Sequence, residues 1–351
     1  CRRQRQMCIR DSLCSDSIAA LDNVELDIVI EATGTPAAGA LVAKNVLNRG
    51  INLILLNVET EATIGLALRK EAEKNNAIVT VADGDEPVAA LDLYNFAKEL
   101  SFDVISIGKG KNNPFNTFAT PSSLTKEASL KQMNPKMLTS FVDGTKTMVE
   151  MAALANFLGF NIDIDGMHGI EATYENINQF YIPKKDGGLL DESQVVDFAF
   201  GIAPGVFAVI YSEDDYVNYE MEYLKMGKGP YWTLARPYHL TSLEIPRTIR
   251  HIMLEKYSKL SAQSWNVEVV AHAKQDIEPG TNLGSIGGDY IYGKAQKTSS
   301  SKGLLPIGIA EDNVVTKAIA KGNPIAIDEV DAQDNELCEY WDYQNQILDS
   351  D

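Results

Sequence analysis

The first third of the chain alternates between short apolar runs and longer segments in which apolar residues recur every three or four positions. The apolar runs, rich in Val, Ile and Leu, cover 26–32, 51–57, 77–83 and 102–108. The segments with helical spacing cover 37–48, 60–75 and 86–100. Strands that alternate with helices of this length are typical of a parallel, doubly wound sheet. The pattern therefore predicts an α/β fold over 15–121, with all four strands in one Rossmann-type sheet.

The pattern changes after residue 121. Residues 143–158 predict an almost wholly apolar helix, and 195–212 predict two strands around a Pro-Gly turn. We therefore expect an α+β catalytic domain over 122–262. Residues 263–351 contain short apolar runs punctuated by Gly and Pro, which predicts a small β-rich C-terminal domain.

The opening CRRQRQMCIRDS is basic and lacks apolar periodicity, unlike the rest of the chain. It resembles a translated sequencing adapter, with a natural basic tail as the alternative, so residues 1–14 are treated as a non-native leader. No GxGxxG follows a strand anywhere in the chain. Since that loop cradles the pyrophosphate in dinucleotide-binding domains, we expect 15–121 to be an incomplete domain of this kind.

The charge composition limits the classes of partner that the protein is expected to bind. The 351 residues include 49 acidic and 31 basic side chains, for a formal net charge of −18. This charge disfavours nucleic acid and anionic membranes, which select basic surfaces. No apolar run approaches the roughly 20 residues that span a bilayer. We expect a cytoplasmic protein whose partner is a small anionic molecule.

Two lysines at the end of the fourth apolar run are the sharpest candidates for chemistry. Lys109 and Lys111 are two residues apart, so each is expected to lower the pKa of the other, and partial burial adds to this effect. Such a lysine acts as a general acid or base, or holds a carboxylate or phosphate. The alternative is a solvated, mobile loop.

A second group of charges lies on the predicted apolar helix. Asp143, Lys146 and Glu150 are spaced by three and four residues, which places them on one helix face. On a buried helix, charges must be paired or must face a cleft. The alternatives are a helix N-cap for Asp143 and a structural ion pair for Lys146 and Glu150.

The histidines do not predict a metal site, because none of the four is spaced as a pair of ligands. His168, three residues before Glu171, is a candidate for substrate contact. Arg236, next to Pro237, Tyr238 and His239, could clamp an anionic substrate.

Several motifs together resemble one family. They are EATGTP (31–36), Asn57-Val-Glu59, ADGDEP (82–87), GKGKNNP (108–114), SFVDGTKTMVEMAALAN (140–156), GMHGIEA (166–172), APGVF (203–207), LKMGKGPY (224–231) and RPYHLTSLE (236–244). The chain is similar over about 16–351 to homoserine-dehydrogenase-like oxidoreductases with a C-terminal SAF domain.

The resemblance implies an NAD(P)-binding domain followed by a catalytic and dimerisation domain, and hence a homodimer or higher homo-oligomer. The family's lysine at a strand end corresponds to Lys109 or Lys111. Its second lysine, with a nearby acid, corresponds to Lys146 with Asp143, and Glu150 completes the catalytic group. The residues expected at the cofactor, NADP or NAD, are Ala32, Thr33, Gly34, Thr35, Asn57, Glu59 and Lys109. The residues expected at the substrate are Asn112, His168, Glu171 and Arg236.

Three functions follow as hypotheses. The first is hydride transfer between NADP or NAD and a small, polar, anionic hydroxy or oxo substrate. One branch of the family resembles a reductoisomerase of 1-deoxy-D-xylulose 5-phosphate, which is the second. The third, from a different class, is a sugar-acid-binding or regulatory protein without turnover.

Overall fold

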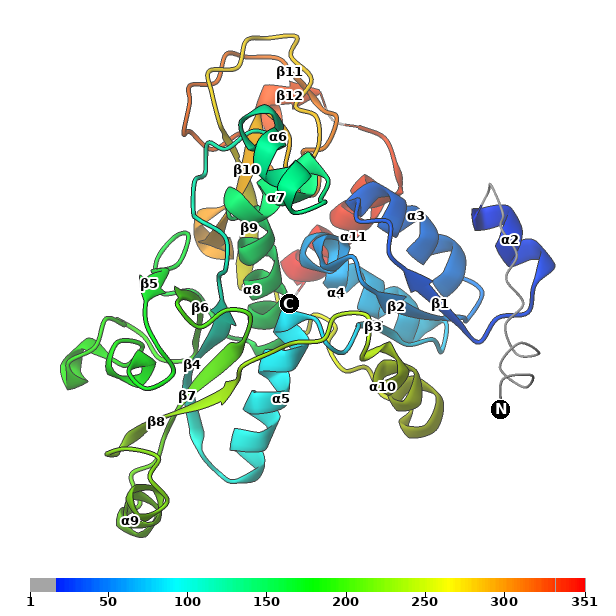
Figure 1. Cartoon of the computed structure of the whole chain (residues 1–351). Coiled ribbons are helices and arrows are strands. Elements are labelled where there is room, and N and C mark those ends of the chain that lie inside the picture. The colour runs from blue at the N-terminus through cyan, green and yellow to red at the C-terminus, as the bar shows by residue number, and fades with distance from the viewer. Residues whose placement is uncertain (1–16, 332, 351) are drawn as a thin grey trace.

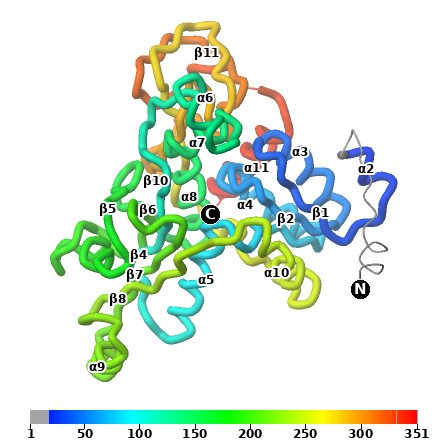
Figure 2. Tube along the Cα trace, in the orientation of Figure 1, coloured from blue at the N-terminus to red at the C-terminus, as the bar shows by residue number. Residues whose placement is uncertain are grey.

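The computed structural model describes residues 17–331 and 333–350, and Figures 1 and 2 show the path of the chain. The predicted leader over 1–14 lies outside these residues. The described chain has a mixed α/β fold with a parallel sheet, a mixed sheet and a C-terminal unit of short strands. In this part of the chain, no helix combines the length and apolarity needed to cross a bilayer.

The N-terminal part is a three-stranded parallel sheet in the order β1-β2-β3. Its elements are α2 (Ser17–Asn23), β1 (Ile28–Glu31), α3 (Pro36–Leu47), β2 (Asn52–Leu55), α4 (Val58–Lys74) and β3 (Val79–Val81). In this register Ile54 pairs with Ile30 on one side and Thr80 on the other. The alternation predicted for 26–83 is confirmed, because each apolar run forms a strand and each helically spaced segment forms a helix.

The fourth predicted strand belongs to a different sheet. After α5 (Glu86–Glu99), β4 (Asp103–Gly110) enters a five-stranded sheet in the order β5-β6-β4-β7-β8. The other strands are β5 (Ile170–Glu171), β6 (Val195–Phe200), β7 (Val206–Tyr211) and β8 (Tyr231–Arg236). The prediction of four strands in one parallel sheet is therefore wrong. All of β4 except Asp103 is buried, and a strand buried on both faces has the same apolar pattern in either sheet.

The position of β4 also separates the two strands that were predicted within 195–212. They are confirmed as β6 and β7, but β4 lies between them, parallel to β6 and antiparallel to β7. Gly108 permits this close approach, since a Cβ there would lie 1.7 Å from the carbonyl oxygen of Asp197. Both edges of β4 are thus paired, and its carboxyl end is held firmly in the middle of the sheet.

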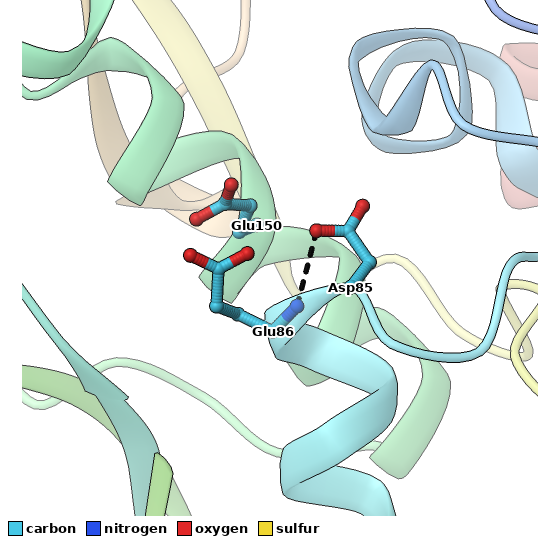
Figure 3. A group of neighbouring side chains, drawn as sticks. All are labelled: Asp85, Glu86 and Glu150. Atoms are coloured by element: carbon cyan, nitrogen blue, oxygen red, sulfur yellow. Dashed lines mark hydrogen bonds between the residues drawn. The ribbon is translucent and has the colours of Figure 1, made fainter. Parts of the chain in front are cut away.

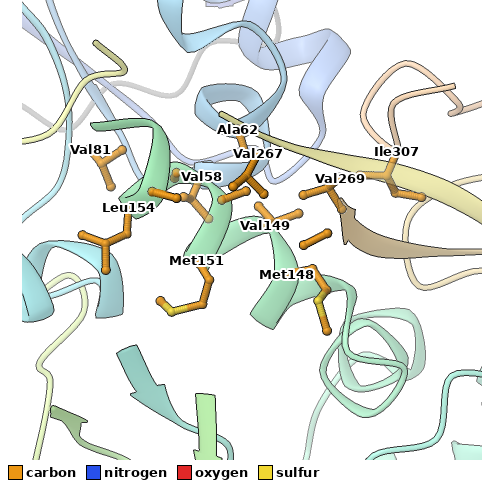
Figure 4. Packing of buried hydrophobic residues seen from close by; sticks show 14 of the residues in the cluster. Val58, Ala62, Val81, Met148, Val149, Met151, Leu154, Val267, Val269 and Ile307 are labelled. Atoms are coloured by element: carbon orange, nitrogen blue, oxygen red, sulfur yellow. The ribbon is translucent and has the colours of Figure 1, made fainter. Parts of the chain in front are cut away.

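Helix α8 (Thr145–Leu158) joins the three parts of the molecule. It packs against α4 and α5, against β6, and against β9 (Val267–Ala273) and β10 (Ile291–Lys297). Figure 4 shows Met148, Val149 and Leu154 of α8 near Val58 of α4 and Val267 of β9. The remaining elements of the central part are α6 (Pro121–Leu130), α7 (Pro135–Val142), η1 (Ile177–Gln179), η2 (Lys184–Asp186), α9 (Asp215–Tyr223), α10 (Ile245–Arg250) and the π-helical turn η3 (His251–Glu255).

The C-terminal unit is built on the antiparallel pair β9 and β10. Its smaller elements are η4 (Thr298–Ser300), β11 (Val314–Val315), η5 (Ile327–Glu329) and β12 (Val330–Asp331). Beyond it, α11 (Glu336–Ser350) returns to pack on α3 and α4. The Gln344 amide accepts a hydrogen bond from the Leu66 N–H at 3.1 Å and donates one to the Thr63 carbonyl at 3.1 Å. These bonds bracket Ile64, where α4 departs from helical geometry. Helix α11 was not among the elements predicted from the sequence.

Candidate active site

Two adjoining cavities lie where β2, β4 and α8 converge. The first, of about 310 Å³, is called the lysine cavity. It is lined by Leu56, Asp85, Glu86, Lys109, Gly110, Lys111, Asn112, Asn113, Phe141, Lys146, Thr147, Glu150, Ala203, Pro204, His239 and Thr241. The second, of about 610 Å³, is called the sheet-edge cavity. It is lined by Ala32, Thr33, Gly34, Thr35, Pro36, Leu56, Glu59, Asn134, Lys136, Met137, Ser140, Phe141, Lys146, Gly284, Ser285, Ile286, Glu311 and Asp312. Leu56, Phe141 and Lys146 line both.

Two carboxylates stabilise the charged form of Lys109 in the lysine cavity. Its ammonium donates hydrogen bonds to Glu86, at 2.7 Å, and to Glu150. Burial by itself lowers the pKa of Lys109, but the charges of Glu150 and Glu86 outweigh burial and hold this pKa above its ordinary value. The predicted lowering is therefore wrong for Lys109, because two carboxylates from α5 and α8 lie nearer than the sequence indicated.

Lys111 is the lysine with a lowered pKa, as predicted. Burial and then the charge of Lys109 lower the pKa of Lys111 to about 8. Its ammonium donates to the Phe141 carbonyl and lies 5.6 Å from the centre of the Phe115 ring. With 5% of its surface exposed, Lys111 is a buried amine that can gain or lose a proton near neutral pH.

Lys146 lies between the two cavities. Its ammonium is 3.0 Å from Glu59 at the start of α4 and 4.0 Å from Glu150, one turn along α8. Burial lowers the pKa of Lys146, but Glu59 and Glu150 more than offset it, so the pKa is raised. The expected pairing of Lys146 with Glu150 is present, with Glu59 as the nearer partner.

Three carboxylates gather on the floor of the lysine cavity. Figure 3 shows Asp85 and Glu86 at the start of α5 facing Glu150 of α8, and ligand oxygens of all three lie within 4.8 Å of one another. Burial, followed by repulsion from neighbouring carboxylates, raises the pKa values of Asp85 and Glu150. Burial opposes ionisation of Glu86, yet Lys109 and His239 hold its pKa below its usual range. Such a group could hold a metal ion, although the Lys109 ammonium already lies on two of its members.

Asp85 and Glu86 belong to the ADGDEP motif and His239 to the polar cluster beside Arg236, but no individual role was predicted for these three side chains. Asp85 accepts a hydrogen bond from the Glu86 N–H at 3.0 Å and caps α5. The Asp-Glu-Pro pattern of a helix start marks this position, but it does not say where the Glu86 side chain points. His239 Nδ1 is 3.0 Å from the Gly84 carbonyl, and Nε2 is 3.4 Å from Glu86.

Asp143 does not share the helix face of Lys146 and Glu150. Gly144 adopts a φ of 90°, so α8 begins only at Thr145 and Asp143 stands before it. Asp143 is fully buried and lines neither cavity. Its carboxylate pairs with Lys274 of the C-terminal unit at 2.8 Å and accepts a hydrogen bond from the Thr145 N–H at 2.9 Å. The expected common face is therefore wrong for Asp143, because the left-handed glycine interrupts the helix.

Most of the residues expected at the cofactor line the sheet-edge cavity: Ala32, Thr33, Gly34, Thr35 and Glu59. Lys109, also expected there, lines the lysine cavity instead. Asn57 lines neither cavity: it is fully buried, accepts a hydrogen bond from the Thr60 N–H at 3.3 Å and donates one to the Thr35 carbonyl at 2.9 Å. Asn57 thus caps α4 and ties two strand ends together.

Of the residues expected at the substrate, only Asn112 lines the lysine cavity. His168 Nε2 lies 2.8 Å from Asp163, and Glu171 is exposed on β5. Arg236 pairs with Glu244 and lies 4.9 Å from the centre of the Tyr238 ring. None of His168, Glu171 and Arg236 lines either cavity. Their contacts with a substrate stay predictions.

Comparison with known proteins bears on the same region. Residues 84–245, less than half of the chain, match the family described as Oxidoreductase DRL, catalytic domain. No curated protein matches the chain. An oxidoreductase from Bacillus cereus is similar over 66% of this chain and 67% of its own, with 15% identity and a TM-score of 0.30. A protein assigned as an oxidoreductase from Bacteroides fragilis is similar over 70% and 74%, with 10% identity and a TM-score of 0.28.

Both TM-scores are too low to establish a shared fold, so the similarity to oxidoreductases rests on the family match. Every residue of the lysine cavity except Leu56 lies within the matched segment. The lysine cavity thus lies in the part of the chain that is similar to an oxidoreductase catalytic domain.

Proposed function

We propose that the protein is an NAD(P)-dependent oxidoreductase that transfers a hydride between the nicotinamide and a small, polar, anionic hydroxy or oxo substrate. The observation that carries this proposal is the pair of adjoining cavities with Lys146 between them. Hydride transfer needs a cofactor and a substrate side by side. The family match of the lysine cavity supports an oxidoreductase.

The sheet-edge cavity suits a dinucleotide. It lies at the carboxyl ends of parallel strands, where nucleotides bind in doubly wound sheets. Gly34 has a φ of 77°, and no atom lies within 4 Å of where its Cβ would be, so the loop offers bare backbone to a ligand. The residues that would hold the cofactor there are Thr33, Gly34, Thr35 and Glu59. When bound, the nicotinamide supplies or accepts the hydride.

The lysine cavity suits the substrate. Lys111 moves the proton: its neutral amine takes the hydroxyl proton during oxidation, and its ammonium returns a proton to the carbonyl oxygen during reduction. Lys109 and Lys146 stay protonated and offer fixed positive charge to an anionic substrate group or to the reacting oxygen. Asn112 adds an amide that can bind a second substrate oxygen.

The test uses the full chain with NAD and NADP, each offered with a panel of hydroxy acids, oxo acids and sugar phosphates. Calorimetric titration measures cofactor binding, and nicotinamide absorbance measures turnover. We expect one cofactor to bind and at least one substrate class to turn over. Absence of both binding and turnover overturns the proposal. Binding of sugar acids without any cofactor would instead support the non-catalytic binding protein.

A second candidate is reductoisomerisation of a sugar phosphate of the 1-deoxy-D-xylulose 5-phosphate type. This chemistry rearranges the carbon skeleton before reduction and is usually assisted by a divalent cation. The group formed by Asp85, Glu86 and Glu150 favours it, because carboxylate oxygens are the ligands that such cations prefer. A cation bound there would have to displace the Lys109 ammonium from Glu86 and Glu150. Turnover of 1-deoxy-D-xylulose 5-phosphate that needs added Mg²⁺ or Mn²⁺ would select this candidate over simple hydride transfer.

A further inference from the structure

A buried ion pair ties the C-terminal unit to the segment that holds Lys111. Lys274, which follows β9, is 2% exposed, and its partner Asp143 is fully buried. The two charged groups are 2.8 Å apart, and the Lys274 ammonium also donates to the Gly288 carbonyl at 2.8 Å. Burying a charge without a partner is unfavourable, so a movement that separated Lys274 from Asp143 would leave an uncompensated buried charge.

The pair fixes a short segment at the entrance to α8. The second carboxylate oxygen of Asp143 accepts a hydrogen bond from the Thr145 N–H at 2.9 Å. The Thr145 hydroxyl in turn accepts a hydrogen bond from the Gly293 N–H of β10 at 2.8 Å. One ion pair and one hydrogen bond from the C-terminal unit therefore converge on residues 143–145.

The same segment holds the amine of Lys111. Phe141, two residues before Asp143, supplies the carbonyl that accepts the hydrogen bond from Lys111. Phe141 also lines both cavities, so a shift of this segment moves the amine and the wall between the cavities together. The charge of Asp143 also acts on Lys111, whose pKa it raises against burial and Lys109.

We infer that Lys274 is a positioning residue for Lys111, acting through Asp143 and the carbonyl of Phe141. This inference rests on the proposed role of Lys111 in proton transfer. It gives the C-terminal unit a part in the reaction: although its Lys274 lines neither cavity, it fixes the place and the charge environment of the amine that does.

The test separates this role from a purely structural one with three variants. Lys274→Met alone leaves Asp143 buried without a cation, and we expect a loss of both stability and turnover. Asp143→Asn with Lys274→Met removes both charges, while the amide introduced at position 143 can still accept a hydrogen bond from the Thr145 N–H, so the melting temperature should recover. We expect kcat of this double variant to stay lower by on the order of 10- to 100-fold, because the amine is misplaced. Lys317→Met, which breaks the exposed pair with Asp328 in the same unit, is the matched control and should retain wild-type turnover.

A readout that does not depend on turnover completes the test. The pKa of the Lys111 amine is measured from the pH dependence of its acylation, followed by peptide mass spectrometry. In the double variant this pKa should fall below the wild-type value, since the charge of Asp143 is gone. A double variant with wild-type kcat and an unchanged Lys111 pKa overturns the inference. If the pKa moves but Lys111→Met leaves turnover intact, the proposed function fails while the coupling of Lys111 to the buried pair of Asp143 and Lys274 stands.

Discussion

Lys109 and Lys111 leave the same strand two residues apart, and their surroundings move their pKa values in opposite directions. Lys109 points between Glu86 and Glu150, which stabilise its ammonium. Among residues 17–331 and 333–350, the hydrogen-bond acceptor of Lys111 is a single backbone carbonyl, and the charge of Lys109 lowers the pKa of Lys111. One lysine therefore supplies fixed charge, and its neighbour supplies a proton that can be exchanged near neutral pH.

The first prediction concerns proton transfer by Lys111. In the oxidation direction kcat/KM should rise with pH through about 8, because the neutral Lys111 amine is the base. In the reduction direction it should fall through the same range, because the ammonium is the acid. Lys111→Met should lower kcat by roughly 10²–10⁴-fold and abolish the pH dependence of kcat/KM near pH 8. Lys184→Met, at an exposed lysine paired with Asp191 away from both cavities, serves as the control. A limb near pH 8 that survives Lys111→Met would assign the titration to another group.

The second prediction concerns the residue between the cavities. Lys146→Met removes the cation between Glu59 and Glu150, so kcat should fall by on the order of 10²-fold. Cofactor binding, measured by calorimetry, should persist, because the Gly34 loop is unchanged. Lys70→Met, on the exposed side of α4, is the matched control. Unchanged turnover would remove Lys146 from the mechanism.

The third prediction concerns a buried acid remote from the lysine cavity. Burial raises the pKa of Glu268 to about 7, even though the Trp265 indole and the Val269 N–H donate to it. Between the unfolded pKa of about 4.3 and this value, the folded state binds more protons than the unfolded state. The free energy of unfolding should therefore fall as pH rises through this window, by about 4 kcal/mol in total.

Urea unfolding at pH 5 and pH 8 tests the role of Glu268. Glu268→Gln should flatten the decline between these two pH values, whereas Glu278→Gln, at an exposed position, should not. An equal decline in both variants would show that other groups set the pH dependence.

The fourth prediction concerns the contact between α11 and α4. Gln344→Leu removes the partners of the Thr63 carbonyl and the Leu66 N–H, which are buried at the irregular turn of α4. Leaving such groups unpaired should lower the free energy of unfolding by about 2–4 kcal/mol. Gln346→Leu, on the exposed side of the same helix, is the control. Equal stability of the two variants would mean that water replaces the lost bonds.

The sequence predicted local structure well and long-range placement less well. Apolar periodicity identified the strands and helices of 26–110, because it reports which face of an element is buried. It could not assign β4 to its sheet, since a strand buried on both faces carries no mark of its neighbours. The interruption before α8 depends on the left-handed backbone of Gly144, which the spacing of Asp143 and Lys146 does not reveal.

In the candidate site, too, the sequence predicted residues marked by local patterns but not those placed by long-range packing. Lys109, Lys111, Lys146 and Glu150 were chosen from strand ends and helix spacing, and all four line the lysine cavity. No role was predicted for Asp85 and Glu86 within the ADGDEP motif, because a capping aspartate followed by a glutamate is an ordinary helix start. Only the packing of α5 against α8 turns these carboxylates toward the lysines.

The bonds of Gln344 to α4 bear on the order in which the chain can fold. During synthesis α4 emerges long before residues 336–350, and until they arrive its irregular turn lacks the Gln344 partner of Thr63 and Leu66. The parallel sheet can therefore form early, but the helix that covers it reaches its final hydrogen bonding only when α11 docks. A nascent chain halted before α11 should accordingly expose α4 to proteases and chaperones that no longer reach it once α11 is in place.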